Sequence, residues 1–110
     1  MPIFSGEQSF KIVARWRVKN GITFAVEVGG KRIRLSFTGH SSSRIKRWGL
    51  SRRMVIQTLL HPEEVVKGHN DRFIAHRRFG DHLVRAVYEY EKGRPVLVTV
   101  YFPYAERSFS

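Results

Sequence analysis

The chain has 110 residues, 42% of them hydrophobic and none of them cysteine, so one domain with a real core fits and a disulfide scaffold or thiolate chemistry is excluded. Its 20 lysines and arginines outnumber 9 acids and give a net charge of +11. Residues 1–60 hold 12 basic and 2 acidic side chains, and thus ten of those charges. The electric field of such a concentrated positive charge attracts polyanions. A surface that serves only solubility normally mixes positive and negative side chains.

The N-terminal residues show no charged start followed by an apolar run, as a signal peptide would. No apolar stretch approaches the roughly 18 residues that a membrane span needs. We therefore expect a soluble, cytoplasmic protein that does not bind membranes.

The first third of the chain alternates apolar and basic residues, which predicts an antiparallel meander over residues 10–18, 22–28 and 31–37. Asn20-Gly21 predicts the first turn, through the positive φ that such hairpins require. In the first strand the expected apolar face consists of Phe10, Ile12, Ala14, Trp16 and Val18. The meander, residues 1–37, is an N-terminal extension that completes the sheet, covers an edge or makes a homodimer, and the sequence leaves these three open.

Two helices are predicted between Thr38 and His61, with five basic residues and no acid between Gly39 and Leu60. Thr38 or one of three following serines caps the first helix, which ends at Gly49 and has Ile45 and Trp48 as its apolar edge. Ser51 caps the second helix, and Pro62 stops it. An unbalanced helical hairpin indicates a counter-charge that comes from another molecule.

Three further strands are predicted over residues 72–79, 83–90 and 95–102. The expected fold is α+β, an antiparallel sheet in the order βββ-αα-βββ with the helical hairpin packed on it. Residues 1–110 are interpreted as one domain. Its core, residues 38–110, contains the stretches that resemble a known family.

A family resemblance rests on "RFGDHLVRAVYEYEKGRPVLVTVYFPYAER", with Arg78, Gly80, Asp81, Arg85, Tyr88, Glu89 and Arg107. This stretch resembles the RelE/ParE class of toxin ribonucleases, within the barnase-EndoU-colicin-RelE-like group. "GHSSSRIKRWGL" and "HPEEVV" resemble a smaller uncharacterised family related to the BrnT toxins. The resemblance covers about residues 38–109. It implies a toxin of a toxin–antitoxin system, acting as a metal-independent endoribonuclease of mRNA-interferase type and held by an acidic antitoxin.

Metal-independent RNA cleavage needs a base for the 2′-hydroxyl, cations for the phosphorane and an acid for the leaving oxygen. His40 is the candidate base, because the helix N-terminus and Arg44 both favour its neutral form. Arg44 and Arg47 would hold phosphate oxygens. Arg85 stands among apolar residues of its strand, where a charge needs a partner or a ligand.

The catalytic candidates are His40, Arg44, Arg85 and Tyr101. The nucleic-acid-binding candidates are Arg47, Arg52, Arg53, Arg77, Arg78, Thr99, Tyr104 and Arg107. Of the adjacent Arg77 and Arg78, only one can line a groove, because neighbouring strand residues face opposite ways. Neither a metal nor a cofactor is expected, since the histidines are irregularly spaced.

Structural roles remain open for the same residues. His40 can cap its helix, Arg85 can pair with Glu89 or Asp81, and the basic hairpin can be a solvated face. The expected partner is RNA or another nucleic acid, with an acidic antitoxin as an additional partner. Two alternative functions are a nucleic-acid-binding module without catalysis, favoured by Glu106-Arg107 where the RelE-like pattern ends in His-Arg, and a basic protein that docks an acidic partner.

Overall fold

The strands and helices of the structure lie close to the positions that the sequence predicts. A computed structural model describes residues 9–103. Its elements are β1 (Phe10–Val18), β2 (Gly21–Val28), β3 (Lys31–Thr38), α1 (Gly39–Trp48), α2 (Arg52–Leu60), β4 (Glu64–Lys67), β5 (Phe73–Phe79), β6 (His82–Glu91) and β7 (Arg94–Tyr101). Within the described residues, both helices are too short to cross a membrane.

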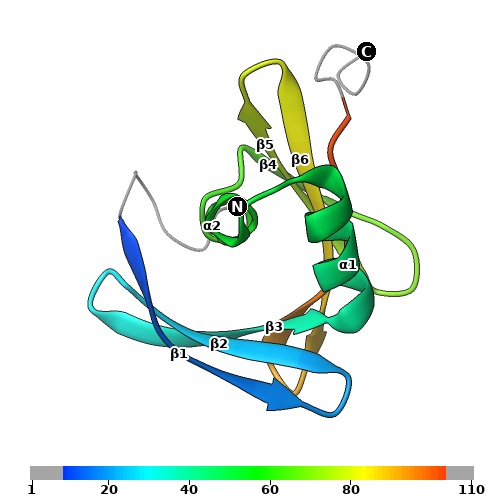
Figure 1. The fold of residues 1–110 in the computed structure, drawn as a ribbon. Helices are drawn as coiled ribbons and strands as arrows, with labels where there is room; N and C mark the ends of the chain where they lie inside the picture. Colours follow the sequence, from blue (N-terminus) through cyan, green and yellow to red (C-terminus); the bar gives the residue numbers. More distant parts are fainter. Residues whose placement is uncertain (1–8, 104–110) are drawn as a thin grey trace.

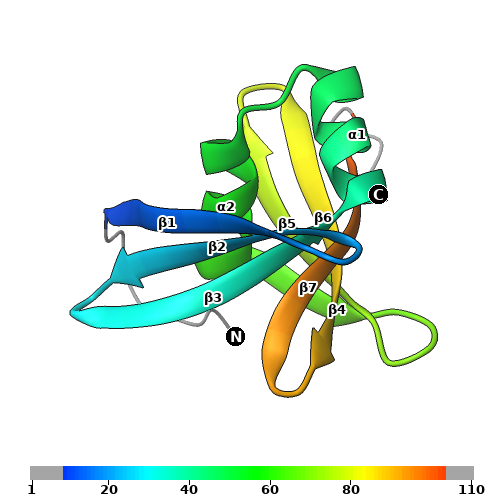
Figure 2. The same ribbon diagram turned by 60° about the horizontal axis from the view of Figure 1, so that its bottom comes forward.

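The strands of the described residues form one sheet in the order β1-β2-β3-β7-β6-β5-β4. The sheet bends so that β1–β3 and β4–β7 form two arms, with α2 lying between them (Figure 1). Figure 2 shows β3 and β7 side by side where the two arms join. The predicted α+β fold is confirmed, and the N-terminal meander completes the sheet.

Two details of the predicted sheet are corrected. The sheet is mixed rather than antiparallel, because β3 and β7 run parallel where Ser36 pairs with Val96 and Phe37 with Leu97. The order is βββ-αα-ββββ, because Glu64–Lys67 adds the edge strand β4 beside β5. A four-residue edge strand with a charge at each end carries too little alternation to stand out in a sequence.

The helical hairpin begins and ends where its capping residues predict. The Thr38 hydroxyl accepts a hydrogen bond from the Ser41 backbone N–H and donates one to the Val98 carbonyl, both at 3.1 Å. Thr38 thereby fixes the start of α1 against β7. Gly49 ends α1 in the left-handed conformation, and the Ser51 hydroxyl caps α2 by accepting from the Met54 N–H.

The predicted apolar face of β1 is wrong from Ala14 onward. The pairing of β1 with β2 shifts register between Ile12 and Ala14, so Val13 forms a bulge. Because one extra residue reverses the facing of all that follow, Arg15 and Arg17 lie on the side of the core residues of β2, and Trp16 lies on the opposite side. The bulge therefore turns arginines, rather than apolar side chains, toward the helices.

Gly21 begins β2 for a reason other than the predicted one. Neither Asn20 nor Gly21 has a positive φ, although the hairpin between β1 and β2 does form. A Cβ atom on Gly21 would instead overlap the backbone carbonyl oxygen of Phe37. The absence of a side chain at this position allows β2 and β3 to approach each other closely.

We expect Gly21→Ala to lower the free energy of unfolding by roughly 1–3 kcal/mol, because the overlapping atom belongs to the backbone and cannot rotate away. Gly39→Ala is the matched control, since a Cβ there meets nothing within 4 Å. Urea denaturation of both variants measures the difference. Equal stability of the two variants would contradict this account of Gly21.

Candidate functional site

The two sides of the β4–β7 arm differ in character. Ala75, Ala86 and Val100, which pair across β5, β6 and β7, are completely buried in the core that includes α2. The residues that alternate with them lie on the other side, which we call the outer face. Of the five candidate site residues on these strands, the outer face carries four, Arg78, Arg85, Thr99 and Tyr101.

A row of four polar side chains crosses the outer face. Glu64 pairs with His76, His76 with Arg85, and Arg85 with Tyr101, so one residue comes from each of β4, β5, β6 and β7. Directly opposed residues in antiparallel strands point to the same side, with Cβ atoms about 4.5–5.5 Å apart. The row therefore aligns a carboxylate, an imidazole, a guanidinium and a phenol.

Arg85 is half-buried, and its Nε is a buried donor with no acceptor among the described residues. Among the described residues, Arg85 forms neither of the ion pairs that the sequence left open, with Glu89 or with Asp81, and Glu89 instead accepts from Arg72 Nε at 3.1 Å. A buried guanidinium donor without an acceptor costs stability. Its position fits a group that meets an anionic ligand.

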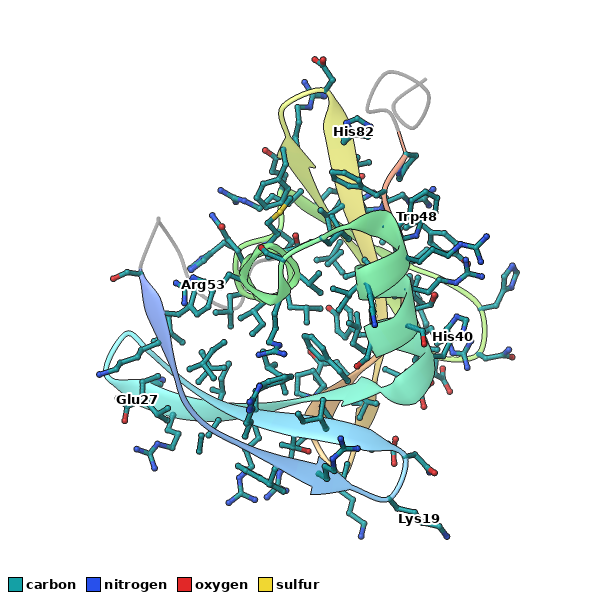
Figure 3. All side chains as sticks on the ribbon, in the orientation of Figure 1. Lys19, Glu27, His40, Trp48, Arg53 and His82 are labelled. Atoms are coloured by element: carbon teal, nitrogen blue, oxygen red, sulfur yellow. The ribbon has the colours of Figure 1, made fainter. Side chains whose placement is uncertain are left out.

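His40 reaches the outer face from the helical side. Its Nε2 lies 3.1 Å from the Thr99 hydroxyl, and Thr99 pairs with Val87 two residues along from the pair of Arg85 and Tyr101. Thr99 and Tyr101 are on one side of β7, so His40 lies on the same side as Arg85. Figure 3 shows His40 on the side of α1 that is turned away from α2. Thr38 caps α1, so His40 is free of the capping role.

α1 continues the site along its outward side. Residues four apart lie one above the other on a helix, so Arg44 and Trp48 follow His40, and Arg47 lies beside them. Trp48 is 42% exposed and labelled on the same side as His40 in Figure 3. Its predicted place in the apolar edge of α1 is thus wrong, and an exposed aromatic ring is available for stacking.

We define the outer site as His40, Arg44, Arg85, Thr99 and Tyr101. All five belong to the residues that the sequence assigned to a site, and α1, β6 and β7 bring them to one side of the molecule. Tyr101 is 46% exposed, so its hydroxyl and ring are accessible. Sequence reasoning missed His76, Glu64 and Trp48. Only Trp48 had a readable signal, its spacing of four from Arg44.

Arg52 and Arg53 lie elsewhere. The Arg53 guanidinium lies 4.2 Å above the ring of Phe10 and donates to the Phe10 carbonyl, and the Arg52 guanidinium lies 4.9 Å above the ring of Phe24. Figure 3 shows Arg53 beyond α2, away from His40. Both arginines contact the N-terminal meander, so the structure does not bring them to the outer site.

The pair on β5 divides between the two faces, as the alternation requires. Arg77 donates to the His61 carbonyl at 2.7 Å and lies on the core side of the sheet. Arg78 is exposed on the outer face, where it pairs with Leu83. Of the two, Arg78 is the one positioned to extend the outer site. Tyr104 and Arg107 lie outside the described residues.

His76 is only 7% exposed. Burial lowers the pKa of this imidazole below the ordinary 6.5, the Arg85 charge lowers the pKa further, and Glu64 opposes both. The neutral form of His76 therefore predominates at pH 7, and Arg85 has a neutral neighbour in β5. Tyr88, on the core side of β6, is not part of the row, and burial raises its pKa to about 12.

The lowered pKa of His76 predicts a pH dependence of stability. An unfolded chain binds a proton at His76 below about pH 6.5, whereas the folded protein resists it, so stability falls as pH drops through this range. We expect His76→Gln to lose less stability than the wild type between pH 7 and about pH 5.5. Denaturation curves at both pH values give the difference, and His69→Gln, in an exposed loop, should keep the wild-type dependence. Identical pH dependence in His76→Gln would contradict the assignment.

Comparison with known families places most of this architecture in one group. The family model described as domain of unknown function DUF4258 matches residues 37–102, from the end of β3 to the residue after β7. β1, β2 and most of β3 precede the matched region. No curated protein and no solved structure matches the chain.

Proposed function

The chain belongs to the DUF4258 family, and from the outer site we propose that it binds RNA and cleaves it without a metal, by attack of a 2′-hydroxyl on the adjacent phosphate. The observation that carries the proposal is the convergence of His40 with Arg85 and Tyr101 on one side of the sheet. Because the family's function is unknown, the proposal rests on the chemistry of these side chains and on the resemblance to RelE- and BrnT-type toxins.

In the proposed reaction, His40 removes the proton of the 2′-hydroxyl while Thr99 orients its ring. The 2′-oxygen forms a bond to phosphorus, and the bond from phosphorus to the 5′-oxygen breaks. Arg85 and Arg44 balance the charge that grows on the phosphorane. Tyr101 donates a proton to the leaving 5′-oxygen, so the products are a 2′,3′-cyclic phosphate and a 5′-hydroxyl.

Exposed aromatic rings support RNA as the substrate in preference to a free anion. Tyr101 and Trp48 are both large, exposed rings near the basic side chains of the outer site. Stacking of unpaired bases on such rings is how proteins commonly hold single-stranded RNA. The net charge of +11 adds a general attraction for the phosphate backbone.

The test is cleavage of an end-labelled single-stranded RNA by the purified protein in excess chelator. The proposal predicts fragments that end in a 2′,3′-cyclic phosphate. If the RNA is bound but stays intact, the second candidate holds, a nucleic-acid-binding module without catalysis. An exposed His40 that hydrogen-bonds Thr99 also fits this second function.

Salt titration separates RNA binding from the docking of an acidic protein. If Arg44, Arg47 and Arg85 each contact one phosphate, the logarithm of the RNA affinity should fall against the logarithm of the salt concentration with a slope of roughly −2. Fluorescence anisotropy with a 2′-deoxy oligonucleotide, which cannot be cleaved, measures this slope. An affinity that does not change with salt would contradict both nucleic-acid functions. A toxin role further predicts growth arrest when the protein is produced alone.

A further inference from the structure

A second basic surface lies on the opposite side of α1 from the outer site. A groove of about 690 Å³ runs between the β1–β2 hairpin and the two helices. Its basic residues come from three elements and one turn, and they are Arg17, Lys19, Lys46 and Arg52. We call it the inner groove. Residues Ser42 and Lys46 of α1 line it, and they project away from the side that carries His40 and Arg44.

The floor of the inner groove is apolar. Phe24, Phe37 and Leu50 are buried core residues, and Ile22 and Ile45 are half-buried beside them. The Arg52 guanidinium covers part of the Phe24 ring, at 4.9 Å. Apolar side chains at the bottom and cations at the rim give this groove an amphipathic character.

The bulge in β1 brings one of the four charges, that of Arg17, to the inner groove. Without the register shift at Val13, Arg17 would lie on the outer side of the meander and Trp16 would lie toward the helices. Among the described residues that line the groove, none is acidic. Four like charges around one depression repel one another, so they favour a ligand that supplies several negative charges.

We propose that the inner groove binds an acidic amphipathic peptide segment of a partner protein. Aliphatic or aromatic side chains of that segment contact Ile22 and Ile45, the half-buried apolar residues of the floor, and its carboxylates meet the four cations of the rim. A phosphate backbone would match the rim but leave the apolar floor without a partner. This proposal is independent of the RNA cleavage proposed for the outer site.

The probe is a fluorescein-labelled synthetic peptide with glutamates on one helical face and leucines on the other. We expect the full-length protein to bind it, and to bind a version with glutamine for glutamate at least about tenfold more weakly. The double variant Arg17→Glu, Lys46→Glu should lose at least about tenfold in affinity for the acidic peptide. The control Lys31→Glu, Lys67→Glu makes the same charge change at two exposed positions, beside the β2–β3 turn and beside the β4–β5 turn, that do not line the groove, and it should bind within about twofold of the wild type.

Thermal unfolding checks that both double variants are folded. Because the reversed charges are exposed, we expect both variants to unfold at the wild-type temperature. Equal peptide affinity in the groove variant and the turn variant would overturn the proposal. So would a groove variant that keeps the peptide but loses a single-stranded RNA of similar length, since that result would assign the groove to nucleic acid. RNA cleavage by the groove variant is measured in parallel, and its retention shows that the two sites act separately.

Discussion

His40→Gln is expected to slow RNA cleavage by about 10²–10⁴-fold, the usual contribution of a positioned general base. Glutamine can still hydrogen-bond the Thr99 hydroxyl, which lies 3.1 Å from His40 Nε2, but it cannot accept a proton near pH 7. The affinity for a 2′-deoxy oligonucleotide should therefore change little while the cleavage rate falls. Single-turnover kinetics with saturating protein measure the chemical step apart from binding.

Two further variants show whether the loss belongs to the imidazole. Ser43→Ala, at an exposed position of the same helix, should cleave at the wild-type rate. Thr99→Val removes the hydroxyl that orients His40, so it should reduce the rate by a smaller factor than His40→Gln does. A His40→Gln protein that cleaves as fast as the wild type would remove His40 from the role of base.

Arg85→Met is expected to reduce cleavage by about 10²–10³-fold and also to weaken oligonucleotide binding, because the guanidinium contacts the phosphate in the ground state and in the transition state. Methionine keeps an unbranched, flexible side chain without the guanidinium. The Nε of Arg85 has no acceptor among residues 9–103, so the substitution also removes a buried polar group that is not hydrogen-bonded. We therefore expect stability to be equal to or greater than that of the wild type.

This combination of lost function and retained stability distinguishes a ligand-binding arginine from a structural one. Arg94→Met is the control, since Arg94 is exposed at the beginning of β7 and Tyr101, which pairs with Arg85, is at its end. It should change neither the cleavage rate nor the melting temperature. If Arg85→Met unfolds at a clearly lower temperature and cleaves normally, Arg85 has a structural role.

Local signals in the sequence were sufficient for the helices and most strands. Capping by Ser51, the left-handed Gly49 and the alternation of β6 each involve interactions within a few residues, so the sequence alone reports them. The same alternation showed Arg85 to be a charged residue among apolar ones, and it was predicted to need a partner or a ligand. In the structure Arg85 is half-buried on the outer face.

Features that depend on long-range pairing could not be predicted. The bulge at Val13 exists because of the register between β1 and β2, and nothing within "FKIVARWRV" shows that the facing reverses. The parallel contact of β3 with β7 joins segments that are far apart in the sequence. Thr38 and Val98, which form a hydrogen bond at this contact, are separated by 60 residues. Periodicity gives the face of a residue within its strand but not its neighbour in the next strand.

The candidate site shows the same division. His40, Arg44 and Arg85 were found from residue type and spacing, whereas the alignment of Glu64 with His76 and Arg85 depends on the pairing of β4, β5 and β6. β4 itself was missed, so its glutamate could not be placed. Trp48 was predicted to form the apolar edge of α1 together with Ile45, and here it is exposed.

The central claim is that one phosphate backbone passes between α1 and the outer face of β6 and β7. A structure of the protein with a short 2′-deoxy oligonucleotide tests it most directly, because the missing 2′-hydroxyl prevents cleavage. The account predicts a phosphate hydrogen-bonded to Arg85, with the 2′ position of the preceding sugar beside His40. An oligonucleotide seated in the inner groove, on the other side of α1, would contradict it.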